Sequence, residues 1–398
     1  MSKSASQREL HARIVEVLET GPRSRAAIAR QLGISRSTVS AYAASLIEDG
    51  LIVAYEDQSF LGPKPAGRPG ELLAIAERDG LLVGIDFGRL SLKVAVSDLN
   101  YTLIDEVDCE FDADLPAAHA VSLAVAQVEA LIARNMIDRS RIDAVGIGVP
   151  GPVDLATGNL HAGSILASWV GTDVTGELSA QLGLPVYMDN DANLGALAET
   201  RLGGASGSQV VLYVLLSVGV GLGIVIGGQV FRGANGIAGE LGHVVTDENG
   251  PICRCGSRGC LEAQISVLAL GRSLQGTLGD IRPAEMLEHA LAGRPGPSRV
   301  VADAGTMAGR ALGALCNYFN PDLILVGGEL MRAGDVLLNP LRESMRRSAI
   351  TRATEHVELR PGALGERAEL YGTLIYAHER TRRSLREVRS PRSAGAET

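Results

Sequence analysis

The chain has 398 residues, of which 46% are hydrophobic and 21% are charged, so it is too long for one ordinary core and too apolar for a disordered polymer. Two or three domains are therefore expected. The 48 glycines are scattered without a period, which excludes collagen and predicts many tight turns. The formal net charge of −9 argues mildly against a nucleic-acid binder, although local charge matters more than the total.

The N-terminal residues have the order of elements of a winged helix-turn-helix. Helices are expected at residues 8–19, 24–32 and 35–49, followed by strands at 51–53 and 72–75 on either side of a stretch rich in Pro and Gly. Ser24 and Ser35 can cap the second and third helices, and Gly33 permits the sharp turn between them. We assign residues 1–78 to a DNA-binding domain of this type, and a small helical domain for protein contact is the alternative.

The third expected helix carries the residues best suited to contact double-stranded DNA. Its outward positions hold small hydroxyls and one guanidinium, from Ser35, Arg36, Ser37, Thr38 and Ser40. Such groups hydrogen-bond phosphates and base edges, and Arg36 can pair with guanine. In the expected wing, Arg68 is placed to enter the minor groove. Between Arg23 and Ile47 the chain has arginines and no acidic residue, which predicts a local basic face.

From residue 79 onward, strands and helices alternate, which predicts an α/β domain over residues 79–385. Strands are expected at 81–86, 93–98, 144–149, 186–188 and 323–326, and helices at 117–135, 175–182, 193–201 and 302–319. The uncharged stretch Val210–Gly228 is long enough to cross a membrane. Glycines interrupt it, so two buried strands are favoured over a membrane span. The polar residues 386–398 are predicted to form a disordered tail.

Three of the five cysteines lie within eight residues and suggest a metal site. The start of the chain has no signal-peptide pattern, so a reducing cytoplasm is expected, and there a tight cysteine cluster favours metal over disulfides. His243, Cys253, Cys255 and Cys260 form the Cys₃His set of structural zinc, in a loop spanning residues 243–260. A disulfide between two of these cysteines, or buried free thiols, are the alternatives. Cys109 and Cys316 are expected to be plain buried thiols.

A second cluster of polar residues suggests a ligand pocket. The segment Asp189–Asn193 follows an expected strand and opens a helix, which is where α/β domains bind ligands. Sugar hydroxyls need acceptors and bidentate partners, and five residues can supply them: Asn190, Asp191, Glu240, His243 and Glu262. The alternative is that Asn190 and Asp191 cap a helix and that the glutamates are surface charges.

Taken together, these motifs resemble the ROK family (repressor, open reading frame, kinase). The resemblance rests on Glu240-x-Gly-His243, the Cys-x-Cys-Gly-x-x-Gly-Cys-x-Glu262 run, Asn190-Asp191-Ala192-Asn193 and the stretch Val149–Asp154. It implies a two-lobed, actin-like domain with ribonuclease-H-like halves, commonly a homodimer or homotetramer. It also implies that Asn190, Glu240, His243 and Glu262 hold a sugar, and that Asp191 is the catalytic base if the chain is a kinase.

The sequence departs from ROK kinases where those enzymes bind nucleotide phosphates. The kinases have Asp-x-Gly-Gly-Thr, whereas this chain has Arg89 in place of a glycine and Leu90 in place of the threonine. In the second phosphate loop, Val220 replaces another threonine, while Gly327-Gly328 keeps the adenosine-side turn. These changes argue that ATP binding is impaired, so the chain is predicted not to be an enzyme.

We therefore expect a transcriptional regulator, in the sense of a repressor, of carbohydrate metabolism genes. A sugar or sugar-phosphate effector in the ROK domain would shift the affinity for a palindromic operator. An ATP-dependent sugar kinase that retains a DNA-binding domain is the alternative from another class. Constitutive DNA binding with a vestigial pocket, and regulation by a partner protein, are further possibilities.

Overall fold

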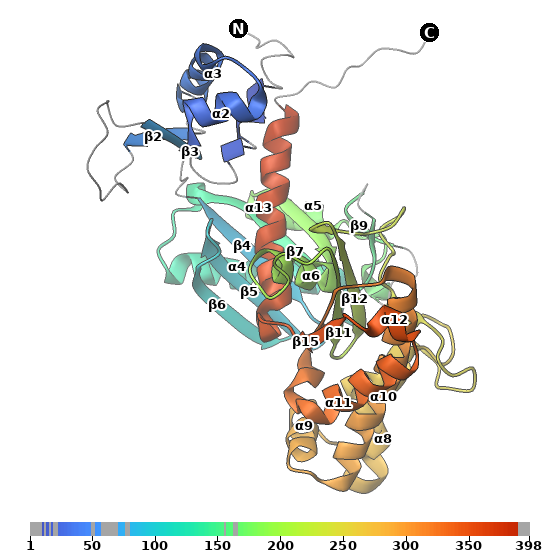
Figure 1. Ribbon diagram of the computed structural model, residues 1–398. Helices are drawn as coiled ribbons and strands as arrows, with labels where there is room; N and C mark the ends of the chain where they lie inside the picture. The colour runs from blue at the N-terminus through green and yellow to red at the C-terminus, as the bar shows by residue number, and fades with distance from the viewer. Residues whose placement is uncertain are drawn as a thin grey trace, which may run out of the picture. The chain divides into compact units, whose positions relative to one another are not determined.

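The computed structural model describes residues 10–11, 13–15, 17–18, 23–48, 52–56, 71–75, 80–154, 157–161 and 166–388. The chain divides into two compact units (Figure 1). Unit 1 consists of Met1–Asp79 and Arg380–Thr398, and unit 2 consists of Gly80–Glu379. The division near residue 79 falls where the sequence changes from helical periodicity to alternating strands and helices.

Unit 1 is a helix-turn-helix with a small antiparallel sheet. Residues 10–11, 13–15 and 17–18 are helical, and the named elements are β1 (Arg23–Ser24), α2 (Arg25–Leu32), α3 (Arg36–Glu48), β2 (Ile52–Glu56) and β3 (Glu71–Ile75). The sheet order is β1-β3-β2. Its core contains the apolar positions expected from the sequence, including the fully buried Ile28, Val39 and Leu46. The wing residues between β2 and β3, with Arg68, lie outside the described residues.

The first half of unit 2 is built on a five-stranded sheet of order β10-β7-β4-β5-β6. Its elements are β4 (Leu81–Phe87), β5 (Ser91–Asp98), β6 (Leu103–Glu110), α4 (Ala117–Arg134), β7 (Ile142–Val149), α5 (Val174–Leu182) and β10 (Val186–Asn190). The short β8 (Val153–Asp154) pairs with β9 (Asn159–Leu160). Three of these strands, β10, β7 and β4, run parallel, so their carboxyl ends meet at one edge.

Helix α4 has the length and composition to cross a membrane, and it is the one such helix among the described residues. Its apolar positions recur on one face and are buried at Ala120, Val121, Ala124, Val128 and Leu131. This face belongs to the core formed with the strands of the first sheet. The amphipathic pattern is that of a helix that covers a sheet in a globular fold.

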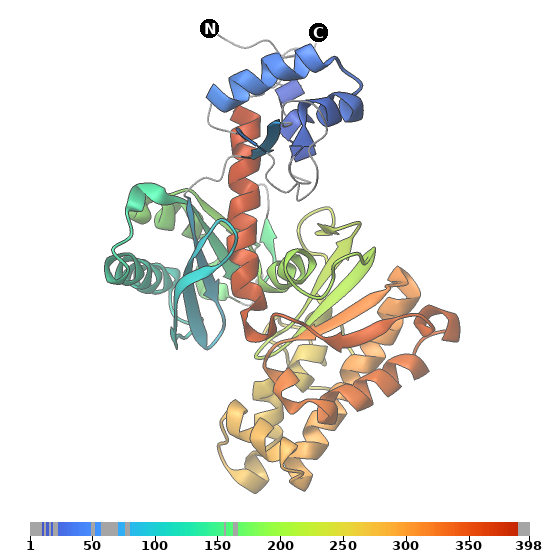
Figure 2. The same cartoon turned by 60° about the vertical axis from the view of Figure 1, so that its left-hand side comes forward.

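The second half of unit 2 has its own five-stranded sheet, of order β13-β12-β11-β14-β15. Its elements are α6 (Asp191–Arg201), β11 (Val210–Leu216), β12 (Val220–Ile226), β13 (Gln229–Val230), α7 (Leu261–Ile265), α8 (Val267–Leu278), α9 (Pro283–Leu291), α10 (Pro295–Phe319), β14 (Leu323–Gly327), α11 (Asp335–Arg347), α12 (Thr351–Thr354), β15 (Glu358–Pro361) and α13 (Ala368–Val388). Helices α8 to α11 gather on one side of this sheet (Figures 1 and 2). The uncharged stretch Val210–Gly228 is the antiparallel pair β11 and β12, which confirms the two-strand prediction.

Two helices pack closely against the sheets because glycines leave room for them. A Cβ atom at Gly146 in β7 would lie 1.9 Å from the carbonyl oxygen of Thr373 in α13. A Cβ atom at Gly223 in β12 would lie 2.3 Å from the carbonyl oxygen of Ala192 in α6. Any side chain at either position would push a helix away, and α6 is the helix that begins at the candidate sugar site.

The C-terminal helix runs further than the sequence predicted. Helix α13 continues to Val388, so residues 386–388 are helical rather than the start of a disordered tail. The reason is local, because this stretch contains Arg and Glu, which are good helix formers, and no Pro or Gly. The remaining tail residues, 389–398, lie outside the described residues.

Candidate functional site

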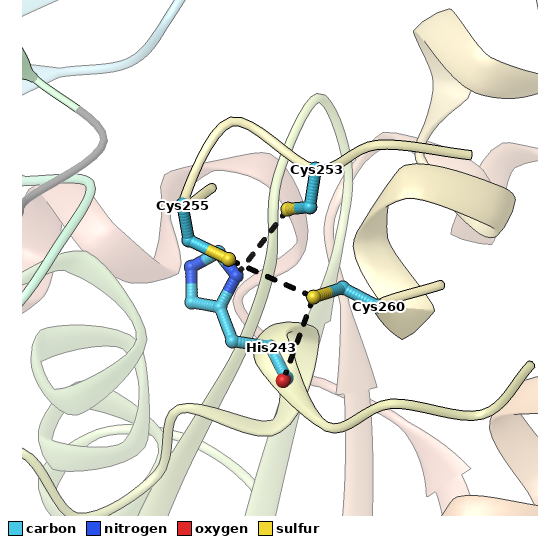
Figure 3. Close-up of side chains that lie close together, drawn as sticks. All are labelled: His243, Cys253, Cys255 and Cys260. Carbon is cyan, nitrogen blue, oxygen red and sulfur yellow. Dashed lines mark hydrogen bonds between the residues drawn. The ribbon is translucent and has the colours of Figure 1, made fainter. Parts of the chain in front are cut away.

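The four predicted metal ligands come together in unit 2. His243 lies on the short 3-10 helix Leu241–His243, Cys253 and Cys255 lie on the following loop, and Cys260 immediately precedes α7. Their ligand atoms all lie within 4.8 Å of one another, and Figure 3 shows the four side chains pointing toward a common centre. Gly256 and Gly259 have φ values of +89° and +70°, which lets the loop curl back so that Cys260 reaches the others.

Two pairs of ligand atoms in this cluster have the separation expected at a tetrahedral ion. The Nδ1 atom of His243 lies 3.6 Å from the Sγ atom of Cys253, and the Sγ atoms of Cys255 and Cys260 are also 3.6 Å apart. Ligand atoms at the corners of a zinc tetrahedron are separated by about 3.3–3.8 Å, given bonds of about 2.0–2.3 Å. Burial raises the pKa of Cys253 to about 12, so the thiol keeps its proton until a cation displaces it.

The predicted sugar residues Asn190 and Asp191 lie at the start of α6. Asn190 is the N-cap, and its side-chain oxygen accepts a hydrogen bond from the backbone N–H of Asn193 at 3.1 Å. Its amide nitrogen donates to the carbonyl oxygen of Gly151 at 3.2 Å and to Asp191 at 3.0 Å. The capping interpretation is therefore correct for Asn190, and the same bonds hold its amide in a fixed orientation beside Asp191.

The other predicted sugar residues lie in or next to the cysteine loop. The Nε2 atom of His243 lies 3.7 Å from the carboxylate of Glu240, so its other ring nitrogen remains free for the metal. Glu262 is 6% exposed and accepts a hydrogen bond from the backbone N–H of Val220 at 3.0 Å. The negative charge of Glu240 raises the pKa of Asp191, and the negative charge of Glu262 raises the pKa of Glu240. The five predicted residues are thus connected pairwise, by a hydrogen bond between Asn190 and Asp191, by the close pair of His243 and Glu240, and by electrostatic effects among the acids.

Buried acids near this cluster shift one another's pKa values. Burial raises the pKa of Asp191 well above its ordinary value, and the neighbouring Asp86 raises it further. Burial, followed by the charge of Glu369, raises the pKa of Asp86 to about 7. Sequence reasoning placed Asp86 only in a degraded phosphate motif and did not single out Glu369, because no local pattern shows that α13 brings it there.

A buried ion pair orients the strand end before Asn190. The guanidinium of Arg232 donates two hydrogen bonds to Asp189, at 2.8 and 2.5 Å, and also lies over the ring of Tyr376. The other carboxylate oxygen of Asp189 accepts from the backbone N–H of Asn190 at 2.8 Å. Asp189 is 1% exposed, so removing Arg232 would leave a buried charge unpaired. The sequence named Asp189 only as part of the polar segment and missed Arg232.

The expected DNA-contacting residues lie around the first turn of α3 in unit 1. The Ser35 hydroxyl accepts from the backbone N–H of Thr38 at 3.0 Å, which confirms the predicted cap. Arg36 and Ser37 are exposed, and the first turn carries no acidic residue. Arg25 is not part of a free basic face, because it forms an ion pair with Glu71 of β3. Arg36 therefore becomes the principal candidate for base contact in the described part of this unit.

The sequence matches two known protein families over separate ranges. Residues 82–380 match the ROK family, and residues 7–59 match the MarR family. The first range spans most of unit 2. The chain belongs to the ROK family.

The relatives of this ROK protein include both repressors and kinases. A xylose repressor of Bacillus spizizenii is 27% identical over 357 residues, covering 90% of the chain and 91% of the relative. A glucokinase of Halalkalibacterium halodurans is 30% identical over 311 residues, covering 74% of the chain and 94% of the relative. The crystal structure of a ROK family transcriptional regulator, a homologue of the Escherichia coli MLC protein, has a TM-score of 0.78 at 22% identity and covers 97% of the chain and 99% of its own.

The extent of these matches separates the two classes. The repressor match extends over nearly the whole ROK chain, whereas the glucokinase match covers about three quarters of it. A DNA-binding domain in front of a ROK domain is the arrangement of a regulator. The comparisons therefore support a sugar-responsive, DNA-binding repressor, with a sugar kinase as the weaker alternative.

Proposed function

We propose that this ROK protein represses carbohydrate metabolism genes and that a sugar bound at the start of α6 changes its affinity for operator DNA. The observation that carries the proposal is the joining, in one chain, of a helix-turn-helix unit and a ROK unit whose sugar-site residues form one cluster. A ligand can shift the equilibrium between two states only if it binds them with different affinities. A symmetric homodimer or homotetramer would present paired α3 helices to a palindromic operator in the cytoplasm.

Within this proposal the zinc ion is structural, and the cluster residues bind the sugar. Four protein ligands leave no open position for substrate, and a metal with closed coordination stabilises its loop. When bound, the ion would hold His243 so that its second ring nitrogen and Glu240 face a hydroxyl group. Asn190, Asp191 and Glu262 would complete the ring of hydrogen-bonding groups.

The DNA-binding part of the proposal predicts a specific loss in one variant. Operator sequences are first selected from random duplex DNA with the purified, zinc-loaded protein, and affinity is then measured by fluorescence anisotropy. Arg36→Ala is expected to weaken operator binding by about 10- to 100-fold, which corresponds to the loss of one bidentate base contact. The matched control is Arg347→Ala, because Arg347 is an exposed arginine in α11 of unit 2. Equal operator affinity in the Arg36 variant and the wild type would contradict the assignment of α3.

A second candidate function, sugar phosphorylation, is favoured by the presence of Asp191 and by the glucokinase relatives. A coupled assay of ADP release over hexoses and pentoses tests it. We expect no sugar-dependent release from the wild type, because Arg89, Leu90 and Val220 replace phosphate-loop residues. Sugar-dependent release that disappears in Asp191→Asn would contradict the regulator-only proposal.

A further inference from the structure

A connecting segment, residues 231–240, leads from β13 in the second sheet to the predicted sugar residue Glu240. It starts next to β12, where the N–H of Phe231 donates to the carbonyl oxygen of Ile224 at 2.7 Å. The segment itself contains no helix or strand. The position of Glu240 therefore depends on the contacts that the connecting segment makes with the rest of unit 2.

Arg232 connects this segment to the strand end that carries the other sugar residues. Its guanidinium donates two hydrogen bonds to one carboxylate oxygen of Asp189, at 2.8 and 2.5 Å. The second oxygen of Asp189 accepts from the N–H of Asn190 at 2.8 Å. Both side chains of the ion pair are largely buried, so solvent screens their attraction only weakly. One carboxylate thus joins the guanidinium to the backbone of a predicted sugar residue.

Arg232 is itself fixed at its backbone and on its other side. Its carbonyl oxygen accepts from the N–H of Ala238 at 3.2 Å, which closes the turn that leads to Glu240. Its guanidinium also donates to the carbonyl oxygen of Val230 at 3.3 Å and lies over the ring of Tyr376 in α13, 5.7 Å from the ring centre. These contacts hold the guanidinium in one orientation, so it can fix the position of the carboxylate that it binds.

The middle of the connecting segment is held against the hairpin of β8 and β9. The carbonyl oxygen of Asn235 lies 2.6 Å from the Nε2 atom of His161, which follows β9. At Gly236, a Cβ atom would lie 2.4 Å from the carbonyl oxygen of Val153 in β8, so the two backbones are in contact. These contacts use the backbone of the segment, and a substitution of the Arg232 side chain leaves their atoms in place.

We propose that Arg232 is a positioning residue of the sugar site and that it acts through Asp189. On one side it fixes the strand end that continues into Asn190 and Asp191, and on the other side its own segment carries Glu240. The inference rests on the proposed function, since it names a residue that sets the affinity of that same site. Groups that bind a ligand must be held within about 0.5 Å of the productive geometry. Loss of the ion pair should therefore weaken sugar binding although no group that touches the sugar is removed.

The experiment is a double-mutant cycle on the affinity for a sugar. D-glucose, D-xylose and further free hexoses and pentoses are titrated calorimetrically into the full, zinc-loaded chain, and the sugar that binds most tightly is used with each variant. Arg232→Gln is expected to weaken its binding by about 10- to 100-fold, as for residues that orient other ligand-binding groups. Asp189→Asn should have a similar effect, and the double variant should lose no more than the larger single loss, because both residues act through one pair. Arg232→Lys should recover part of the affinity, because it keeps the charge but not the planar fork.

Arg201→Gln is the matched control. Arg201 lies at the other end of α6, where it pairs with Glu379 of α13 and donates to the carbonyl oxygen of Gly228 at 3.0 Å. The sugar affinity of this variant should stay within about threefold of the wild type. Zinc content and thermal unfolding are measured for every variant, and the titrations are made well below each melting temperature, so that only folded proteins are compared. If Arg232→Gln does not fold, Arg232→Lys and Asp189→Asn carry the same test, each with an expected loss of sugar affinity.

The outcomes separate the positioning role from the proposed function. An unchanged sugar affinity in Arg232→Gln, additive losses in the double variant, or an equal loss in Arg201→Gln would overturn the positioning role and leave the proposed function standing. If no sugar binds the wild type while its operator binding is intact, both proposals fail.

Discussion

Replacing Cys260 with serine is expected to abolish stoichiometric zinc binding and to lower the melting temperature of unit 2 by about 4–6 °C. Cys260 is fully buried and is the N-cap residue of α7, so the loop cannot replace it with another ligand. Structural zinc contributes directly to folding free energy, and a loss of only ~3 kcal/mol gives this change in melting temperature for a domain of this size. Zinc content by mass spectrometry and thermal unfolding measure the two effects.

The chain contains a matched control for this prediction. Cys109 is a half-buried thiol on the edge strand β6, far along the chain from the cluster, and Cys109→Ser should keep one zinc per chain. The Cys260 variant should also lose effector binding, because the zinc loop carries His243 and positions Glu262. Retention of one tightly bound zinc by Cys260→Ser, or an unchanged melting temperature after zinc is chelated from the wild type, would show that the cluster is not a structural metal site.

Elements that bury one face in a regular period could be predicted from the sequence. Helices α2 and α3 and their serine caps follow from local chemistry, since Ser24 and Ser35 accept hydrogen bonds within their own first turns. The strands β4, β7 and β11 are mainly apolar and almost entirely buried, as expected for strands covered on both faces. The cluster of His243 and the three cysteines could also be predicted from the sequence, because its residues lie within eighteen positions and the glycines that bend the loop stand between them.

Features that depend on distant parts of the chain could not be predicted in this way. The edge strand β6 carries Asp105, Glu106, Asp108 and Glu110, so it lacks the apolar alternation of a covered strand. The partners of Asp189 and Arg25, which are Arg232 and Glu71, lie more than forty residues away in sequence. No pattern of spacing identifies such pairs, because burial and proximity are properties of the packed fold.

The same limit applies to Asp86, whose titration the sequence did not suggest. The side chain is 7% exposed, and the surrounding charges are Glu369 and Asp108, which raise its pKa, and Lys93, which lowers it. Burial is the largest effect, and the net result moves the pKa from 3.8 to about 7. The folded state therefore binds a proton that the unfolded state releases between those two values. The stability that this proton provides is complete below pH 3.8 and is lost as pH rises through 7.

Asp86→Asn is expected to become more stabilising, relative to the wild type, as pH rises from 5 to 8. The asparagine carries no charge at either pH, whereas the wild type must bury an ionised carboxylate at pH 8. A pKa raised by about three units makes the difference in unfolding free energy grow by ~2–3 kcal/mol across this range, or about 3–5 °C in melting temperature. Effects of pH on the zinc ligands are common to both proteins and cancel in the comparison.

Glu110→Gln supplies the matched control, because Glu110 is an exposed carboxylate at the end of β6 in the same sheet and the pKa of Asp86 does not depend on it. Its effect on stability should stay within about 0.5 kcal/mol at both pH values. Parallel melting curves for the Asp86 variant and the wild type from pH 5 to 8 would mean that the carboxylate is already satisfied in its ionised form. A growing difference would mean that Asp86 is partly protonated at neutral pH. A neutral carboxyl at Asp86 would place less negative charge beside Asp191, whose pKa Asp86 raises when it is ionised.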